Sequence, residues 1–381
     1  MLRWTTVIRE DSIRLMNKSS FGTHFTVTTW GESHGKALGA VVDGCPAGLS
    51  LCEEDIQKFL DRRKPGQSRY TTARKEGDLV EILSGIFEGK TTGTPISLIV
   101  RNTDQRSRDY GNIALSYRPG HADYTFDAKY GFRDYRGGGR SSGRETIGRV
   151  AAGAIAIKFL QNLGISITAY TQCIGGVGID YDRFDIEERD RNPFAMPDAE
   201  SAEQIREMAE KAIAEHDSLG GIVECVVTGM PAGIGEPVFD KLDATLAKAL
   251  VSIGAVKGFE MGDGFMVADL RGSEDNDEFY MEGGKVKKRT NHSGGTLGGI
   301  SDGSSLVFRA AVKPTPSIAM VQNTVGHDGS EMQIGIKGRH DPVIVPRAVV
   351  VVEAMTACTI TDLLLQNMSA RMENVIKVYG K

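Results

Sequence analysis

A nine-residue pattern occurs twice in the chain and limits the folds that the chain can adopt. Residues 41–49 read V-V-D-G-C-P-A-G-L, and residues 226–234 read V-V-T-G-M-P-A-G-I. Each copy precedes a predicted helix, and its glycine–proline framework requires one particular strand-to-helix turn. The neighbouring predicted strands and helix also follow in the same order. We therefore favour two related halves, about 21–200 and 201–381, joined in a single domain, over two independent domains.

Hydrophobic patterning predicts alternating strands and helices along the chain. Strands are expected at residues 25–29, 40–43, 80–83, 96–100, 165–174, 255–261 and 306–312. Helices are expected after residue 53 and at residues 145–163, 202–215 and 240–252. Several connections are too short for the crossovers of a wholly parallel sheet. The pattern therefore favours a layered sandwich of the mixed α/β or α+β class.

Three local signals set the predicted element ends. Ser50 and Glu53 form a capping-box pattern at the start of the first helix, and Ser201 is expected to cap the helix at residues 202–215. The apolar run at residues 343–352 is interpreted as the last strand, interrupted by Pro346 and followed by a helix from residue 353 to about 373.

Residues 117–144 stand apart from the rest of the chain in composition. They contain no Val, Ile, Leu or Met, but five arginines, six aromatic residues and six glycines. Such a segment is too poor in aliphatic side chains for a core element and too aromatic for a disordered tether. Guanidinium groups match phosphate and carboxylate oxygens, and glycine lets the backbone approach a ligand closely. We interpret the segment as an ordered loop system that forms the floor of an anion-binding site.

The overall composition narrows the partners that the protein could bind and the compartment in which it could work. The net charge of −5 argues against nucleic-acid binding, because a duplex-binding protein usually carries a basic face over much of its surface. The five cysteines are scattered without a C-x-x-C motif, which is typical of a reducing cytoplasm. No apolar run is long enough for a membrane span, and the first residues do not form a signal peptide. Residues 1–20 are treated as an N-terminal extension outside the core, with Met16 as an alternative start.

Two histidines have cationic or glycine-rich surroundings that suit proton chemistry on an anion. His34 lies in G-E-S-H-G and His121 in R-P-G-H-A-D. Three further loops combine basic residues with Gly/Pro turns, at residues 62–69, 313–317 and 338–342. Each loop by itself could be plain surface, but together they could assemble one polyanion site. No G-x-G-x-x-G, P-loop, metal-ligand spacing or G-x-S-x-G motif is present.

The motifs G-E-S-H-G, D-R-R-K-P-G-Q-S-R, R-P-G-H-A-D, Y-R-G-G-G-R-S-S-G-R-E, S-I-G-A-V-K-G, K-P-T-P-S and G-R-H-D-P resemble those of the chorismate synthase family, in the same order. The resemblance covers essentially everything after residue 20. It implies a β–α–β sandwich with internal pseudo-symmetry and a homotetramer. It also implies a shikimate-pathway lyase that converts 5-enolpyruvylshikimate 3-phosphate to chorismate by 1,4-elimination of phosphate, using reduced FMN without net redox change.

The resemblance also implies roles for individual residues. His34 matches the histidine that protonates the departing phosphate, and His121 matches the one near the flavin ring that stabilises the anionic reduced flavin. Asp341 matches the carboxylate that helps the flavin N5 take up the C6 proton. The matching substrate-binding positions are Arg63, Arg69, Arg118, Arg144 and Arg339. The matching cofactor-binding positions are Arg140, Ser141, Ser142, Gly254, Ala255, Gly298, Lys313, Pro314, Thr315, Pro316, Ser317 and Arg339.

Some features depart from the family pattern or stay open. Gly254 stands where many relatives have asparagine, Pro316 where many have serine, and Gly143 where many have alanine. Family members either reduce their flavin with NADPH or rely on an external flavin reductase, and the sequence does not choose between these. Two other classes remain as alternatives. One is a polyanion- or RNA-binding module built on the R-G-G-G-R run, and the other is a flavin oxidoreductase with net electron transfer.

Overall fold

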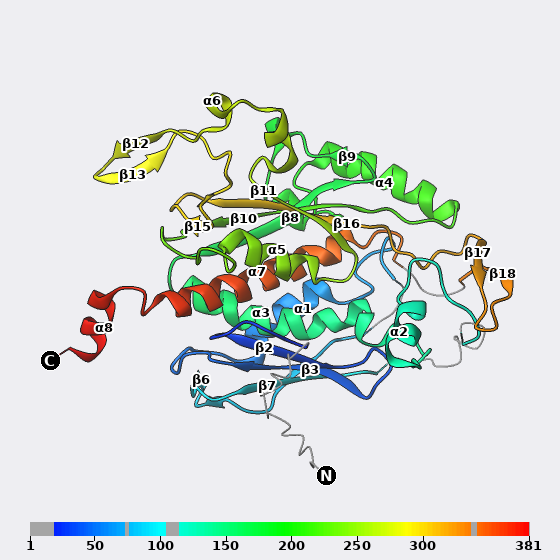
Figure 1. Cartoon of the computed structure of the whole chain (residues 1–381). Helices are drawn as coiled ribbons and strands as arrows, with labels where there is room; N and C mark the ends of the chain where they lie inside the picture. Colours follow the sequence, from blue (N-terminus) through cyan, green and yellow to red (C-terminus); the bar gives the residue numbers. More distant parts are fainter. Residues whose placement is uncertain (1–18, 73–75, 104–113, 337–340, 381) are drawn as a thin grey trace, which may run out of the picture.

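Two five-stranded sheets enclose a layer of helices in the computed structural model, which describes residues 19–72, 76–103, 114–336 and 341–380 (Figure 1). The first sheet has the order β1 (Ser20–Phe21), β2 (Thr26–Gly31), β3 (Ala37–Asp43), β7 (Ile96–Arg101), β4 (Val80–Ile82). The second has the order β11 (Val256–Met261), β16 (Leu306–Val312), β10 (Gly221–Thr228), β8 (Ser166–Ile174), β9 (Val177–Gly178). All strand pairs of these two sheets are antiparallel. The predicted α+β sandwich is confirmed.

The helical layer is the core of the molecule. It consists of α1 (Glu53–Arg63), α3 (Thr146–Gln161), α5 (Leu242–Val251) and α7 (Val345–Asn367). Buried side chains of these helices and of both inner sheet faces form one continuous hydrophobic cluster. The remaining helices are α2 (Asp123–Tyr130), α4 (Ala199–Ala214), α6 (Gly272–Asp275) and α8 (Met372–Tyr379). Small hairpins pair β5 (Ile86–Phe87) with β6 (Lys90–Thr91), β12 (Phe279–Glu282) with β13 (Lys285–Lys288), β14 (Thr296–Leu297) with β15 (Ile300–Ser301), and β17 (Gln322–Val325) with β18 (Glu331–Ile334).

The repeated nine-residue pattern forms the same turn twice, after the central strands β3 and β10. In the first copy the Thr91 hydroxyl, from β6, donates to the carbonyl of Pro46 at 2.6 Å. In the second copy the Ser301 hydroxyl, from β15, donates to the carbonyl of Pro231 at 2.6 Å. A hydroxyl from a neighbouring hairpin therefore fastens both proline turns in the same way.

The order of elements repeats around these two turns. The first half runs β2, β3, α1, β4, β7, α3, and the second runs β8, β10, α5, β11, β16, α7. Within the sheets, the order β2-β3-β7-β4 corresponds to β8-β10-β16-β11. The expected division near residue 200 does not coincide with the division between the sheets, because β8 and β9 already belong to the second sheet.

The predicted strand at residues 343–352 is wrong. This segment begins helix α7, with Pro346 in its first turn, where a missing N–H removes no intrahelical hydrogen bond. The valine-rich run is buried between the two sheets, so tertiary packing outweighs the β preference of β-branched residues. Among the described helices, α7 alone has the length and apolarity to cross a membrane, but 89% of that stretch is buried inside the protein.

Two predicted caps and one predicted loop also differ from the structure. The N-cap of α1 is Cys52, whose N–H donates to Asp55, so the expected pair of Ser50 and Glu53 lies two residues too early. Helix α4 starts at residue 199 because Asp198 accepts the first free N–H groups, ahead of Ser201. The segment predicted as loops at residues 117–144 contains the two-turn helix α2.

The crossing of α3 and α7 generates a stability prediction. A Cβ at Gly153 of α3 would lie 2.3 Å from the Cβ of Ala354 on α7. We expect Gly153→Val to lower the free energy of unfolding by about 1–3 kcal/mol, because the core has no room for the added side chain. Urea unfolding midpoints measure the effect. The control is Gly272→Ala, where a Cβ meets nothing within 4 Å, and equal midpoints for the two variants would contradict the prediction.

Candidate active site

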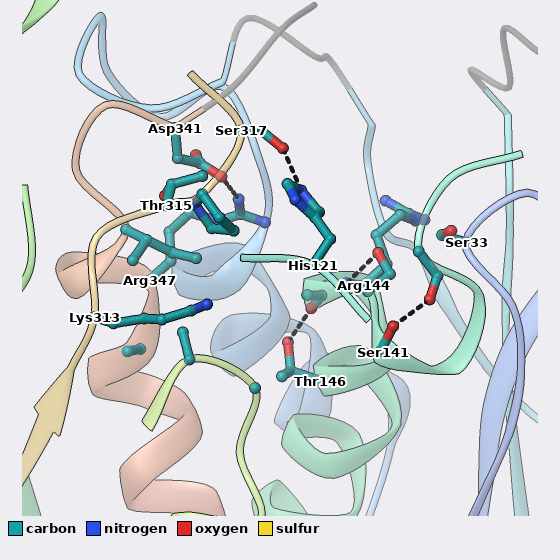
Figure 2. Close-up of a pocket in the computed structure, with 18 of the residues that line it drawn as sticks. Ser33, His121, Ser141, Arg144, Thr146, Lys313, Thr315, Ser317, Asp341 and Arg347 are labelled. Atoms are coloured by element: carbon teal, nitrogen blue, oxygen red, sulfur yellow. Dashed lines mark hydrogen bonds and ion pairs between the residues drawn. The ribbon is translucent and has the colours of Figure 1, made fainter. Parts of the chain in front are cut away.

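A cavity of about 480 Å³ lies where the N-terminal ends of α3 and α7 meet loops from both halves of the chain (Figure 2). Helix α3 contributes Thr146 at its first turn, and α7 contributes Arg347. The loop after β16 supplies residues 313–317, and the turn between α5 and β11 supplies residues 253–255. Because a helix N-terminus carries a partial positive charge, two long helices directed at one cavity favour anions there.

The cavity brings together most residues of the predicted site. Those lining it are His34, Arg63, Arg118, His121, Ser141, Ser142, Arg144, Gly254, Ala255, Lys313, Thr315, Pro316, Ser317 and Asp341. They come from seven separate stretches of sequence. The view in Figure 2 shows Asp341 and Lys313 on one side, Arg144 and Ser141 on the other, and His121 between them.

Four other predicted residues that the structure describes do not line this cavity. The side chain of Arg69 is 67% exposed and pairs with Glu210. Arg140 folds back onto the first sheet, where it donates to the carbonyls of Thr29 (3.0 Å) and Gly31 (3.1 Å) and borders a second, separate hollow. The guanidinium of Arg140 is therefore already hydrogen-bonded to backbone carbonyls.

Two further predicted positions also lie elsewhere, and a third cannot be placed. Gly298 sits in the turn of the β14–β15 hairpin. Pro314 packs beside Gly220 rather than facing the cavity. Arg339 falls outside the described residues.

Arg118 is a buried guanidinium held by one carboxylate. Its Nε and Nη2 atoms donate to the two oxygens of Asp123, both at 2.8 Å, and its backbone N–H donates to the same group at 3.0 Å. Burial raises the pKa of Asp123, but the hydrogen bonds and charge of Arg118 outweigh burial, so the pKa of Asp123 is lowered. The pair is thus ionised and rigid, which fixes a positive charge at the cavity wall.

Arg63 and Arg144 share a second buried carboxylate. Asp78 accepts from Nη1 of Arg63 at 2.9 Å and lies 3.2 Å from Nη1 of Arg144, which also contacts Glu76 at 2.6 Å. Burial, followed by the charge of Arg347, lowers the pKa of Arg63 to about 9. Arg63 therefore remains protonated at neutral pH, and the cavity keeps both cations.

His121 connects the two halves of the chain. Its Nδ1 donates to the carbonyl of Pro119 (2.9 Å), which fixes the tautomer, so in the neutral ring Nε2 accepts the hydroxyl of Ser317 (2.8 Å). The same loops meet again where Lys313 donates to the carbonyl of Gly120 at 2.8 Å. Burial and the charge of Arg118 lower the pKa of His121 to about 4. The imidazole is therefore neutral at pH 7 without an anionic ligand.

His34 lies against bare backbone. Its Nδ1 is 3.2 Å from the Ser33 hydroxyl. A Cβ added at Gly137, whose φ is +85°, would lie 2.4 Å from that nitrogen. Gly137 is therefore required by the close approach of the backbone to the imidazole, as well as by its left-handed conformation.

Asp341 is held at both carboxylate oxygens. The Thr72 N–H donates to Oδ1 at 2.8 Å, and Nη1 of Arg347 donates to Oδ2 at 2.7 Å. Sequence reasoning missed Arg347 because it placed this residue in a strand. Pro346, as a helix-start signal shortly after the G-R-H-D-P motif, could have indicated it.

Other cavity residues were also missed. Thr146 accepts from Nε of Arg63 at 3.0 Å, and Lys257 lies close enough to Lys313 to contribute, after burial, to lowering the pKa of Lys313. Lys257 is part of the S-I-G-A-V-K-G motif, and this could have indicated it as a cavity residue. No group of three or more metal-ligating side chains occurs among the described residues.

The fold and the cavity define an α+β protein with a buried, positively charged site for a small anionic molecule. Comparison with known proteins narrows this class. The family model of chorismate synthase matches residues 25–365. The chain is 68% identical to the chorismate synthase of Lachnospira eligens over 366 residues, covering 96% of this chain and 100% of that protein. It is 57% identical to the chorismate synthase of Methanosarcina mazei over 350 residues, covering 91% and 96%.

A solved structure agrees with these relatives. A crystal structure of chorismate synthase superimposes with a TM-score of 0.74 at 33% identity, over 94% of this chain and 96% of that one. The chain therefore belongs to the chorismate synthase family, as the motifs predicted. This membership places it among the enzymes that form chorismate, which is a lyase reaction.

The buried histidine generates a pH prediction. Because the folded-state pKa of His121 (about 4) lies below its ordinary value of about 6.5, the unfolded chain binds this proton first. The stability contributed by neutral His121 is thus present above about pH 6.5 and is lost as the pH falls toward 4. We expect the difference in unfolding free energy between the wild type and His121→Gln to shrink over this range. Urea unfolding at several pH values measures it, and a difference independent of pH would contradict the lowered pKa.

Proposed function

We propose that the chain catalyses the 1,4-elimination of phosphate from 5-enolpyruvylshikimate 3-phosphate, giving chorismate, with reduced FMN required but not consumed. The observation that carries this proposal is the single cavity that gathers His34, His121 and Asp341 with three buried arginines. Family membership supports the chorismate-forming step.

The charges of the cavity suit this substrate. The substrate carries two carboxylates and a phosphate, so its binding requires several fixed cations. Arg63, Arg118 and Arg144 are buried and already oriented by carboxylates, so little reorganisation is needed when an anion enters. Lys313 and Lys257 add ammonium groups on another wall.

The reaction balances without an external oxidant. The bond between C3 and the phosphate oxygen breaks, with its electron pair leaving on the phosphate. A proton leaves C6, and a second ring double bond forms. We assign His34 as the proton donor to the departing phosphate, and Asp341 as the carboxylate that ultimately takes the C6 proton. His121, neutral in the ligand-free cavity, gains a proton more readily when an anion lies beside it.

The residues present fit a flavin phosphate. The cavity volume of about 480 Å³ lies within the range of small-molecule sites. The hydroxyl of Thr315 is buried without a hydrogen-bond partner in the described part of the chain, so a ligand group could satisfy it. Ser317, Lys313 and the Gly254–Ala255 backbone would complete the binding wall, whereas Pro316 offers no donor. When bound, reduced FMN supplies electron density that assists cleavage of the carbon–oxygen bond.

The alternative RNA-binding function has less support. Arg136 is paired with Asp134 through both Nε (2.8 Å) and Nη2 (2.7 Å), and Arg140 is bound to backbone carbonyls. The guanidinium groups of the R-G-G-G-R run are therefore engaged within the protein.

The wider setting is proposed on the same basis. We propose a cytoplasmic homotetramer without nucleic-acid or membrane partners, whose flavin is reduced either with NADPH or by an external flavin reductase. Light scattering would test the tetramer by its mass, and a monomer would contradict it. Anaerobic bleaching of FMN by NADPH in the presence of the protein alone would separate the two sources of reduced flavin.

The two histidines generate an activity prediction. We expect His34→Ala and His121→Ala to bind reduced FMN but to lose on the order of 10²–10⁴ in the rate of phosphate release, because each removes a proton-transfer group. The measurement is anaerobic phosphate release from 5-enolpyruvylshikimate 3-phosphate with reduced FMN. His24→Ala is the matched control, because His24 is exposed and does not line the cavity.

Three outcomes of this assay would contradict the proposal. Folded wild-type protein that releases no phosphate would refute the lyase function. Consumption of one reduced flavin per turnover would indicate an oxidoreductase. Full activity of both cavity variants would remove the assigned roles of the histidines.

A further inference from the structure

Arg347 stands at a junction between two parts of the cavity. It lies in the first turn of α7, and its side chain is 14% exposed. Nη1 donates to Oδ2 of Asp341 at 2.7 Å, and Nε donates to the backbone carbonyl of Arg63 at 3.1 Å. The Arg347 guanidinium thus connects the end of α1 to the carboxylate of Asp341. Figure 2 shows the contact between Arg347 and Asp341 at the cavity edge.

Hydrogen bonds at both of its oxygens restrain the Asp341 carboxylate more than one hydrogen bond would. A carboxylate held at one oxygen can still rotate about its last torsion, which is broad for aspartate. Here the Thr72 N–H holds Oδ1 while Arg347 holds Oδ2, so both oxygens have fixed donors. Because Nε of Arg347 is tied to the backbone of α1, the donor itself cannot follow a moving carboxylate.

The surrounding charges make this arginine the direct electrostatic partner of Asp341. Arg347 acts on Arg63 through space, and Arg63 in turn is flanked by Arg144 and by the carboxylate of Asp78. Arg63 and Arg144 both contact Asp78, whereas Arg347 contacts Asp341. Replacing Arg347 would leave the described surroundings of Asp341 with a single backbone N–H as donor.

We propose that Arg347 is a positioning residue that fixes the orientation of the Asp341 carboxylate for proton removal at the substrate ring. This inference rests on the proposed function, because it takes Asp341 as the proton acceptor. Arg347 acts through Asp341, so its loss changes the rate of the chemical step rather than the affinity for substrate.

The kinetic test compares Arg347→Gln, Arg347→Lys, Asp341→Asn and the double variant Arg347→Gln/Asp341→Asn. We expect Arg347→Gln to lower kcat by roughly 10- to 100-fold, as for other residues that orient a reacting group, with KM nearly unchanged. Lysine should restore part of kcat, since it returns the charge without the planar fork. The double variant should be no slower than Asp341→Asn alone, because the two residues act as a unit.

A matched control separates positioning from general stabilisation. Arg62, adjacent to Arg63 on α1, makes a comparable two-pronged pair with Glu353 of α7 (2.6 and 3.0 Å), but it does not line the cavity. Arg62→Gln should lower the unfolding midpoint without changing kcat. If Arg347→Gln also lowers the unfolding midpoint and leaves kcat unchanged, the proposal is overturned.

A second readout needs neither cofactor nor substrate. Aspartate labelled with ¹³C at the side-chain carboxyl gives an Asp341 signal that Asp341→Asn identifies. We expect this signal to shift and broaden in Arg347→Gln and to stay unchanged in Arg62→Gln, because only the former removes the donor that holds one carboxylate oxygen and so lets the carboxylate rotate. An unchanged signal in Arg347→Gln would contradict the proposal.

The remaining outcomes also decide the matter. A raised KM with an unchanged kcat would show that Arg347 binds substrate directly, and losses that add in the double variant would show that it acts apart from Asp341; either result overturns the proposal. If the wild type releases no phosphate, the proposed function fails. The carboxyl signal would then still test whether Arg347 holds the Asp341 carboxylate in one orientation.

Discussion

Buried carboxylates determine whether the cations of this cavity can exist inside the protein. An unpaired guanidinium in a protein interior costs several kcal/mol, whereas one held by a carboxylate with good geometry is tolerated. Asp123 holds Arg118 at both oxygens, and Asp78 lies between Arg63 and Arg144. The ion pairs leave the arginines fixed and charged before any ligand arrives. An incoming anion therefore meets oriented donors rather than mobile side chains.

The internal repeat explains why these groups converge at one place. Equivalent strands β7 and β16 end on the same side of the molecule, and equivalent helices α3 and α7 begin there. Asn102, just after β7, accepts from Arg144, while Lys313, just after β16, reaches the carbonyl of Gly120. The cavity thus lies between the halves, and neither half contains it alone. Because neither repeat has a complete site, the site forms only when the two halves pack together.

Proton chemistry in this cavity depends on how differently its titratable groups are held. His121 is neutral because burial and Arg118 disfavour its cation, and its tautomer is fixed by a backbone carbonyl. Asp341 is held at both carboxyl oxygens, by the guanidinium of Arg347 and by the Thr72 N–H. A positively charged cavity with a neutral imidazole and a carboxyl group held in one orientation can receive an anion and redistribute its protons afterwards. This arrangement suits the proposed elimination.

The sequence by itself determined the repeated turn, most strands and the chemical character of the site. Glycine–proline spacing and alternating apolar residues are local properties, so β3, β7, β10 and β16 could be predicted without knowing their neighbours. The motif resemblance found most of the cavity residues, including both histidines, because these residue types recur in fixed order along the chain. Local competition between nearby capping residues decided the helix starts, and there Asp198 and Cys52 replaced the predicted caps.

Only the tertiary structure decided the rest. A valine-rich run reads locally as a strand, but its burial between two sheets made it helix α7 and placed Arg347 at the cavity. Arg140 belonged to the expected site by motif, yet carbonyls of the first sheet hold it elsewhere. The carboxylates that pair with Arg63 and Arg144 lie many residues away along the chain, so local sequence patterns do not predict these ion pairs. Long-range packing sets such partnerships, because the cost of burying a charge is assessed only in the folded molecule.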